Sequence, residues 1–207
     1  MTHAEVHDLL AEAVAALRAG ELVIYPTETF YGIAADPESP RAMAKIFDLK
    51  GRAPDQPIAL IAADSESAFA LAREVPPLAR RLAARFWPGP LSIVLPARAG
   101  LHEAVRGPDG VGVRVSSHPI ARRLAAAFGR PITATSANLS GQPAMTRPAD
   151  VRAVFCDKVK VILEDGVLAG GAPSTVVAVT AAGYRIIRHG AVAARAIAET
   201  AAGKELG

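Results

Sequence analysis

The sequence predicts an α/β protein built on a mixed β-sheet, and three observations lead to this fold class. Short apolar segments of strand length alternate along the chain with longer segments of helical periodicity, which is typical of a sheet flanked by helices. Hydrophobic residues make up 51% of the chain but aromatic residues only 5%, so aliphatic side chains must fill the core. Only four residues separate the strand-like segments 175–179 and 184–188, too few for a crossover, so this pair must be antiparallel.

The N-terminal part of the chain contains a helix, a strand and a second helix. Residues 2–19 carry apolar side chains at helical spacing, and Gly20 follows as a stop signal. Residues 22–25 form a short apolar run that predicts a strand. Ser39 is a suitable N-cap for a helix that begins at the proline after it and covers about 40–47.

The same alternation continues to the C-terminal end. The Ala-rich tail after Gly190 predicts a helix that frays, and no linker is long enough to separate two domains. We therefore expect one domain over residues 1–207, with a core at about 5–190 and a tail at 191–207. The remaining predicted strands are 58–62, 91–95, 111–115, 132–135 and 159–163, and the remaining helices begin at Asp64 and after Pro77 or cover 119–128 and 148–155.

Composition and missing signatures exclude several classes of protein. The formal charge is +3, which is only mildly basic, and Cys156 is the single cysteine, so neither an internal disulfide nor a cysteine-based metal site can form. No signal peptide or membrane-length apolar run is visible, which predicts a cytoplasmic protein. The five histidines lack metal-ligand spacing, and the chain has no phosphate-loop, dinucleotide-binding or nucleophile-elbow motif.

Arg114 is the clearest polar residue in a position where the pattern favours an apolar one. In the segment 111–115, valines alternate with Gly112 and Arg114, so the guanidinium points either to solvent or into a cavity. A glycine beside it leaves room for a ligand carboxylate, which arginine can hold through two hydrogen bonds.

Lys50 and Arg52 form a second candidate site, in a segment that Pro54 and Pro57 should make a stiff loop. If this loop is extended, the spacing aims both cations to one side, which suits a polyphosphate. The alternative is that nearby aspartates only compensate the two charges.

Further polar residues stand where predicted strands end or begin. Ser136 and Asn138 follow the strand 132–135, at a position where ligands tend to bind in α/β sheets, although an ordinary turn would look similar. Likewise, Thr27 follows the first strand and Ser174 precedes a later one.

Taken together, these stretches resemble the YrdC/TsaC family of threonylcarbamoyl-AMP synthases, and their order and spacing agree with it over about residues 21–190. The motifs that carry the resemblance are Tyr25-Pro-Thr-Glu-Thr-Phe-Tyr-Gly32, Lys50-Gly-Arg52, Phe86-Trp-Pro-Gly-Pro-Leu-Ser92, Val113-Arg-Val115 with His118-Pro119, Thr135-Ser-Ala-Asn-Leu-Ser-Gly141, Pro173-Ser174 and Arg188.

The resemblance implies a twisted, open sheet with a concave, positively charged cavity, and it assigns roles to individual positions. Thr27, Arg114, Ser174 and, through its backbone, Ala134 would bind threonine. The residues implied for the nucleotide and its phosphates, four of them catalytic, are Lys50, Arg52, Ser136 and Asn138 together with Arg188.

The resemblance also implies the reaction. L-threonine, bicarbonate and ATP would give threonylcarbamoyl-AMP and pyrophosphate, for N6-threonylcarbamoyladenosine at position 37 of ANN-decoding tRNAs. Mg²⁺ would bind through the ATP phosphates rather than at a protein-built metal site. The expected partners are a downstream tRNA threonylcarbamoyl transferase complex and, with weak affinity, tRNA or other RNA.

Two departures from the family pattern concern its longer members. In those relatives the segment after the Lys-x-Arg motif ends in a histidine that helps bind threonine, whereas residues 57–63 here contain none. The chain also ends where those relatives continue into a second domain, so it is similar to the short, single-domain type.

Two other functions remain open at this stage. The predicted basic concavity could dock structured tRNA or ribosomal RNA through its phosphates, in which case the chain would be a binding module. It could also transfer a carbamoyl group from carbamoyl phosphate, because the family includes a domain of hydrogenase-maturation proteins. That reaction would need no free threonine.

Overall fold

The structure is a computed structural model that describes residues 3–51 and 56–203. Most strands are short, with two to six residues. The helices are α1 (His3–Arg18), α2 (Pro40–Lys50), α3 (Ser65–Phe69), α4 (Pro77–Phe86), α5 (Pro119–Phe128), α6 (Pro148–Phe155), α7 (Ala194–Ala201) and the short 3-10 helix η1 (Glu103–Val105). The strands are β1 (Val23–Pro26), β2 (Tyr31–Ala34), β3 (Leu60–Ala62), β4 (Leu91–Leu95), β5 (Arg106–Gly107), β6 (Gly110–Val115), β7 (Ile132–Thr133), β8 (Thr135–Ser136), β9 (Val161–Ile162), β10 (Thr175–Thr180) and β11 (Gly183–Arg188).

The strands divide into two sheets. A four-stranded sheet has the order β8-β2-β1-β9, and a seven-stranded sheet has the order β11-β10-β4-β6-β3-β7, with β5 paired to β6. Parallel pairs (β1 with β9, β4 with β10, β3 with β6) occur beside antiparallel ones, and β10 and β11 are antiparallel as predicted. The predicted α/β class with a mixed sheet is thus confirmed, but its strands form two sheets rather than one.

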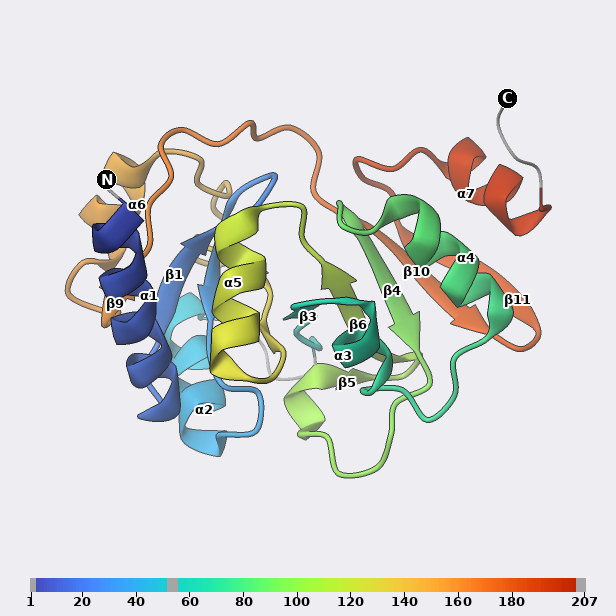
Figure 1. Cartoon of the computed structure of the whole chain (residues 1–207), viewed down its shortest axis with the longest axis horizontal. Helices are drawn as coiled ribbons and strands as arrows, with labels where there is room; N and C mark the ends of the chain where they lie inside the picture. The colour runs from blue at the N-terminus through green and yellow to red at the C-terminus, as the bar shows by residue number, and fades with distance from the viewer. Residues whose placement is uncertain (1–2, 52–55, 204–207) are drawn as a thin grey trace.

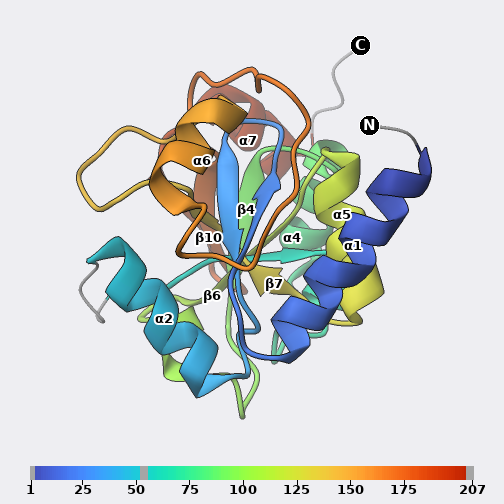
Figure 2. The same ribbon diagram turned by 90° about the vertical axis from the view of Figure 1, so that its left-hand side faces the viewer.

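Helices cover both faces of the four-stranded sheet. Figure 2 shows α1 and α5 together on one side of β1 and β2, with α2 and α6 on the other. Both helix groups contribute to the core, α1 and α5 through Leu17 and Leu124, and α2 and α6 through Ile46 and Phe155. At the other end of the molecule, α4 packs with α7 beside β4 and β10 (Figure 1).

The predicted strand 132–135 is two strands, one in each sheet. Ile132–Thr133 pairs with β3, and Thr135–Ser136 pairs with β2. The Thr133 hydroxyl donates to the carbonyl of Ile33 and accepts from the amide of Ala35, at 2.9 and 2.8 Å. The chain therefore passes from one sheet to the other at Ala134.

A second connection crosses between the sheets. Residues 163–174, drawn in orange in Figure 1, run from β9 to β10, and we call this segment the strap. It is fastened by backbone and side-chain hydrogen bonds: the amide of Gly170 donates to Thr29, and the Tyr31 hydroxyl donates to the carbonyl of Gly166. The strap thus lies against the loop that follows β1.

Two local predictions were wrong, and one strand was not predicted. Residues 31–34 form β2, within a motif for which we predicted no strand. Lys50 is not in a loop but is the last residue of α2, and Gly51 caps this helix with φ 59°. The C-terminal helix does not fray, because Ile197 of α7 is fully buried and Arg85 of α4 donates a 3.0 Å hydrogen bond to Thr200.

Within the described ranges, none of the helices combines the length and the apolar character needed to cross a membrane.

Candidate active site

A cavity of about 610 Å³ lies between the two sheets, large enough for a ligand of nucleotide size. Its walls come from both sheets: Tyr31 and Gly32 belong to β2, and Val94 and Val176 belong to β4 and β10. The segment in which the chain passes from one sheet to the other also lines the cavity, with Ala134 and Ser136. The sequence-predicted site residues that line this cavity are Thr27, Arg114, Ala134, Ser136, Ser174 and Arg188.

Arg114 points into the cavity rather than to solvent. The alternation of β6 buries Val111, Val113 and Val115 on one face and turns Gly112 and Arg114 toward the cavity. Arg114 is only 8% exposed, and its guanidinium approaches the Ser174 hydroxyl at 3.4 Å.

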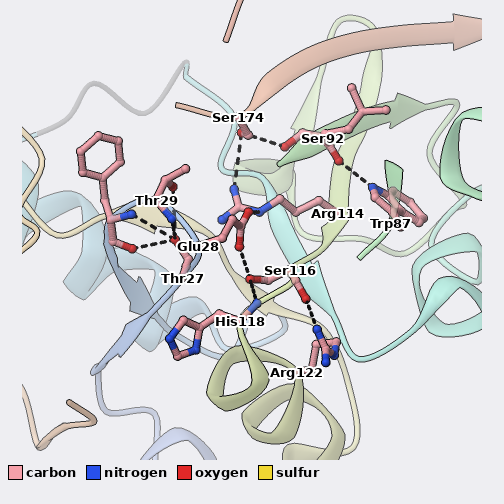
Figure 3. Close-up of polar contacts among 12 residues, drawn as sticks. Thr27, Glu28, Thr29, Trp87, Ser92, Arg114, Ser116, His118, Arg122 and Ser174 are labelled. Carbon is pink, nitrogen blue, oxygen red and sulfur yellow. Dashed lines mark hydrogen bonds and ion pairs between the residues drawn. The ribbon is translucent and has the colours of Figure 1, made fainter. Parts of the chain in front are cut away.

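Ser174 is held between two arginines. Besides Arg114, the guanidinium of Arg188 on β11 donates to the Ser174 carbonyl at 2.8 and 3.2 Å and to its hydroxyl at 3.0 Å. The Ser92 hydroxyl on β4 lies 3.2 Å from that of Ser174 (Figure 3). Two cations and two hydroxyls therefore meet at one point of the wall, an arrangement suited to an oxyanion.

Thr27 shapes the turn between β1 and β2. Its hydroxyl donates to the carbonyl of Phe30 at 2.7 Å and accepts from the amides of Thr29 and Phe30, both at 3.3 Å. This is the local hydroxyl-to-backbone bonding that favours threonine in turns. It fixes the hydroxyl of Thr27 at the cavity wall, opposite Arg114 (Figure 3).

Lys50, Ser136 and Asn138 form one hydrogen-bonded cluster. The buried Lys50 ammonium donates to the carbonyls of Ser136 and Asn138 at 2.6 and 3.0 Å, and to the side-chain oxygen of Asn138 at 3.0 Å. Ser136 donates to that same oxygen at 2.5 Å, and the Asn138 amide nitrogen donates to Gln142 at 2.6 Å. Of these three residues, all within the described ranges, Ser136 lines the cavity, whereas Lys50 and Asn138 lie behind it.

Of the two remaining predicted residues, Ala134 can be placed and Arg52 cannot. Ala134 lines the cavity where the chain changes sheets, and its amide donates to the carbonyl of Ala59 at 2.7 Å. Arg52 lies outside the described residues, so the predicted pairing of its charge with that of Lys50 stays a prediction.

The sequence did not single out Glu28, Ser92 or Ser116. Glu28 follows Thr27 and lies beside Arg114, with 3.3 Å between Oε1 and Nε, and its other oxygen accepts from the Ser116 hydroxyl. A serine inside the fully buried strand β4 was a usable signal for Ser92. The contact between Glu28 and Ser116 spans 88 residues and leaves no trace in local spacing.

Among the titratable groups near the cavity, Tyr25 and His118 have shifted pKa values. Burial raises the pKa of Tyr25, whose hydroxyl donates to the Thr133 carbonyl at 2.9 Å beneath the cavity. Burial also lowers the pKa of His118 below its usual 6.5, although the carboxylate of Asp165 in the strap, 3.1 Å away, opposes the shift. Both groups are therefore uncharged at neutral pH.

In the part of the chain that the structure describes, no three His, Cys, Asp or Glu residues lie close enough together to hold a metal ion. The carboxylate of Asp109, which lines the cavity, is bound by Arg185, and that of Glu28 faces Arg114.

Known proteins share this sequence and fold. The Sua5/YciO/YrdC family model, described as "Telomere recombination", matches residues 15–190. A threonylcarbamoyl-AMP synthase of Pyrococcus abyssi is 41% identical over 165 residues, 79% of this chain but 48% of that protein. One of Chromohalobacter salexigens is 41% identical over 174 residues, 83% of this chain and 93% of that protein.

A solved structure, P. abyssi Sua5 complexed with L-threonine, is similar to this chain with a TM-score of 0.88 and 37% sequence identity. The match covers 94% of this chain and 57% of that one, so this chain spans about half of the P. abyssi protein. The family match over most of the sequence, together with the shared fold, establishes that the chain belongs to the Sua5/YciO/YrdC family.

Proposed function

We propose that the chain is an L-threonylcarbamoyladenylate synthase, which converts L-threonine, bicarbonate and ATP into threonylcarbamoyl-AMP and pyrophosphate. The observation that carries this proposal is the cavity between the sheets, where Arg114, Ser174 and Arg188 converge opposite Thr27. The names of the two 41% identical relatives support the same reaction.

Threonine would bind at the Arg114 end of the cavity. The guanidinium of Arg114 offers donors for the α-carboxylate, and Ser174 can add a hydroxyl. Thr27 and the backbone at Ala134 line the same space and would fix the rest of the amino acid. Because residues 57–63 contain no histidine, these groups must orient threonine without one.

The nucleotide would bind along Ser136 and Arg188, with Lys50, Arg52 and Asn138 as further residues of this subsite. Lys50 supports this assignment by holding the carbonyls of Ser136 and Asn138, so that it shapes the loop that faces the phosphates. A phosphate oxygen that approached Lys50 would have to replace one of these acceptors.

The chemistry needs no enzyme nucleophile. The neutral amine of threonine adds to CO₂ derived from bicarbonate and loses a proton, which gives a carbamate. A carbamate oxygen then attacks the α-phosphorus of ATP, and the bond to the departing pyrophosphate breaks. Because anions must meet, positioning and cationic donors supply most of the barrier reduction. Arg114 and Arg188, about the same serine, fit this requirement.

Mg²⁺ bound by the ATP phosphates and water would neutralise charge on the leaving pyrophosphate. The lack of an acidic cluster among the described residues is compatible with an ion that arrives with its nucleotide.

Pyrophosphate release from ATP tests the proposal. We expect release only when threonine, bicarbonate and ATP are all present, and loss of release when any one is omitted. Release that continued without threonine would contradict the amino-acid assignment and favour carbamoyl transfer from another donor. RNA binding that weakens steeply with salt, with no pyrophosphate under any condition, would favour the binding module.

The proposal has consequences outside the cavity. The product would pass to a tRNA threonylcarbamoyl transferase complex that modifies adenosine 37 of ANN-decoding tRNAs, and weak contact with tRNA would be compatible with that transfer. We also propose that residues 1–207 act as one domain in the cytoplasm, because the two sheets and the packed helix α7 contribute to a common core.

A further inference from the structure

Glu28 and Arg114 form a buried ion pair that is not a hydrogen bond. Their side chains are 12% and 10% exposed, and 3.3 Å separates Glu28 Oε1 from Arg114 Nε. These are the two buried side-chain atoms of the described residues for which no hydrogen-bond partner is present. The two charges therefore balance each other, while the remaining donors of the guanidinium stay directed toward the cavity and Ser174.

The Glu28 carboxylate is fixed from the side away from the cavity. Its second oxygen accepts from the Ser116 hydroxyl, which itself accepts from the amide of His118 at 3.2 Å. The Ser116 carbonyl accepts from Arg122 of α5 at 2.7 Å. Figure 3 shows this chain of contacts behind Arg114, so the negative charge has a set position beneath the amino-acid pocket.

Glu28 offsets the charge of Arg114, whereas Arg188, which reaches the same serine, belongs to the proposed nucleotide subsite. Asp109 lines the cavity, but its carboxylate is bound by Arg185 at 2.7 and 2.8 Å. With Glu28 ionised, the pair of Glu28 and Arg114 is neutral overall, which matches a ligand that carries both an ammonium and a carboxylate. A ligand with only a carboxylate would gain the attraction of Arg114 but also meet the repulsion of Glu28, with no positive charge to offset it.

We propose that Glu28 is a specificity-determining residue of the amino-acid pocket, and that its carboxylate makes the pocket bind a zwitterionic α-amino acid in preference to the same acid without its amine. This inference rests on the proposed function, since it concerns the pocket assigned to threonine. It adds a residue that acts on the substrate through Arg114 and through its own charge.

The test compares L-threonine with 3-hydroxybutanoate, which lacks the amine, by calorimetric titration of the full chain. The wild type should bind threonine at least about tenfold more tightly. Glu28→Gln keeps the size of the side chain and one of its two acceptor oxygens but removes its charge. It should reduce this preference by about tenfold, because it should weaken the binding of threonine but not that of the amine-free acid. Glu28→Asp, which keeps the charge, should retain most of the preference.

Glu38→Gln is the matched control, because Glu38 also pairs with an arginine, Arg130 at 2.6 Å, but on the surface. It should leave both affinities unchanged. An equal loss of affinity for both ligands in Glu28→Gln would mean that Glu28 only supports the fold and would overturn the inference. If that variant does not fold, wild-type protein that binds the two acids equally would overturn it.

These outcomes separate the inference from the function on which it rests. If the wild type releases pyrophosphate with threonine but Glu28→Gln keeps the preference for the amine, the proposed function stands and the inference is wrong. Wild-type protein that neither binds threonine nor releases pyrophosphate would remove the function itself.

Discussion

Lys50 connects the Lys-x-Arg motif to the Ser-x-Asn motif through hydrogen bonds. From the sequence alone, the two motifs could be related only through a ligand that both would bind. Its ammonium is bound by three oxygens of Ser136 and Asn138, and the amide of Ser140 donates to the Lys50 carbonyl at 2.9 Å. A buried cation with this many acceptors stabilises the loop, and it would also stabilise a phosphate that binds there. Lys50 is therefore a structural residue of the site in addition to its proposed role with the nucleotide.

Replacement of Lys50 by methionine should reveal both roles. The side chain keeps its length but loses the donors, so the free energy of unfolding should fall by about 2 kcal/mol, and pyrophosphate release should nearly cease. Lys45→Met on the same helix is the control, because Lys45 pairs with Glu21 in a partly exposed ion pair worth less than about 1 kcal/mol. Urea unfolding and the pyrophosphate assay measure the two effects, and equal losses of stability in both variants would contradict the account.

His118 should make stability depend on pH. Burial lowers its pKa in the folded state below 6.5, so the unfolded chain takes up the proton first as the pH falls. The stabilising effect of the neutral ring is complete above 6.5 and is lost as the pH falls below that value.

The variant His118→Asn isolates this effect, because asparagine can still cap α5, where His118 now accepts from the Ile120 amide at 3.3 Å, but cannot titrate. Between about pH 8 and about pH 5, the wild type should lose more unfolding free energy than the variant in urea titrations. Equal losses would show that the proton uptake belongs to other groups.

Single residues differ in how far the sequence could place them. Arg114 was predictable as either solvent-exposed or cavity-facing, because alternation with valines fixes its face but not what lies opposite. What lies opposite is Ser174, 60 residues away. Glu28 gave no signal of its own, since the meaning of its charge depends on Arg114 and Ser116, which only the folded chain brings next to it.

At the scale of elements, the helices with clear end signals were predicted best. Helix α5 begins with Pro119 and ends before Gly129, which has φ 84°, and both boundaries agree with the prediction. Nothing within the predicted strand 132–135 indicates its division, in which Thr133 pairs with a strand of one sheet and Thr135 with a strand of the other. Strand β2 was missed although it pairs with the preceding strand β1 as well as with the distant β8.

Gly51 and Gly129 offer a comparison between two helix ends. Both cap a helix with positive φ, 59° and 84°, and a Cβ atom added to either would meet nothing within 4 Å. Substitution of either by alanine should therefore lower the free energy of unfolding by about 1 kcal/mol through backbone strain alone. Only Gly51→Ala should also raise the KM for ATP severalfold, because Gly51 connects Lys50 to Arg52. An unchanged KM, despite the loss of stability, would place the Lys-x-Arg motif away from the nucleotide.

At the scale of the whole molecule, the site exists because two sheets face each other across a cavity. Besides the connection from β2 to β3, the chain crosses between them at Ala134 and in the strap, and these last two crossings bring residues of the proposed site to the wall. A mixed sheet was predictable from the four-residue connection before 184, but the division into two sheets was not, since it depends on long-range pairing. The fold thus brings the residues proposed to bind the amino acid to the same cavity as Ser136 and Arg188, two of those proposed to bind the nucleotide.

The central claim is that this cavity joins threonine, the carbon of bicarbonate and the adenylate of ATP. Mass spectrometry of a reaction with ¹³C-labelled bicarbonate tests it most directly. Wild-type protein should form threonylcarbamoyl-AMP that carries the label, and Arg114→Gln should form little of it at the same threonine concentration. An adenylate without label, or a labelled product whose formation does not require threonine, would contradict the account.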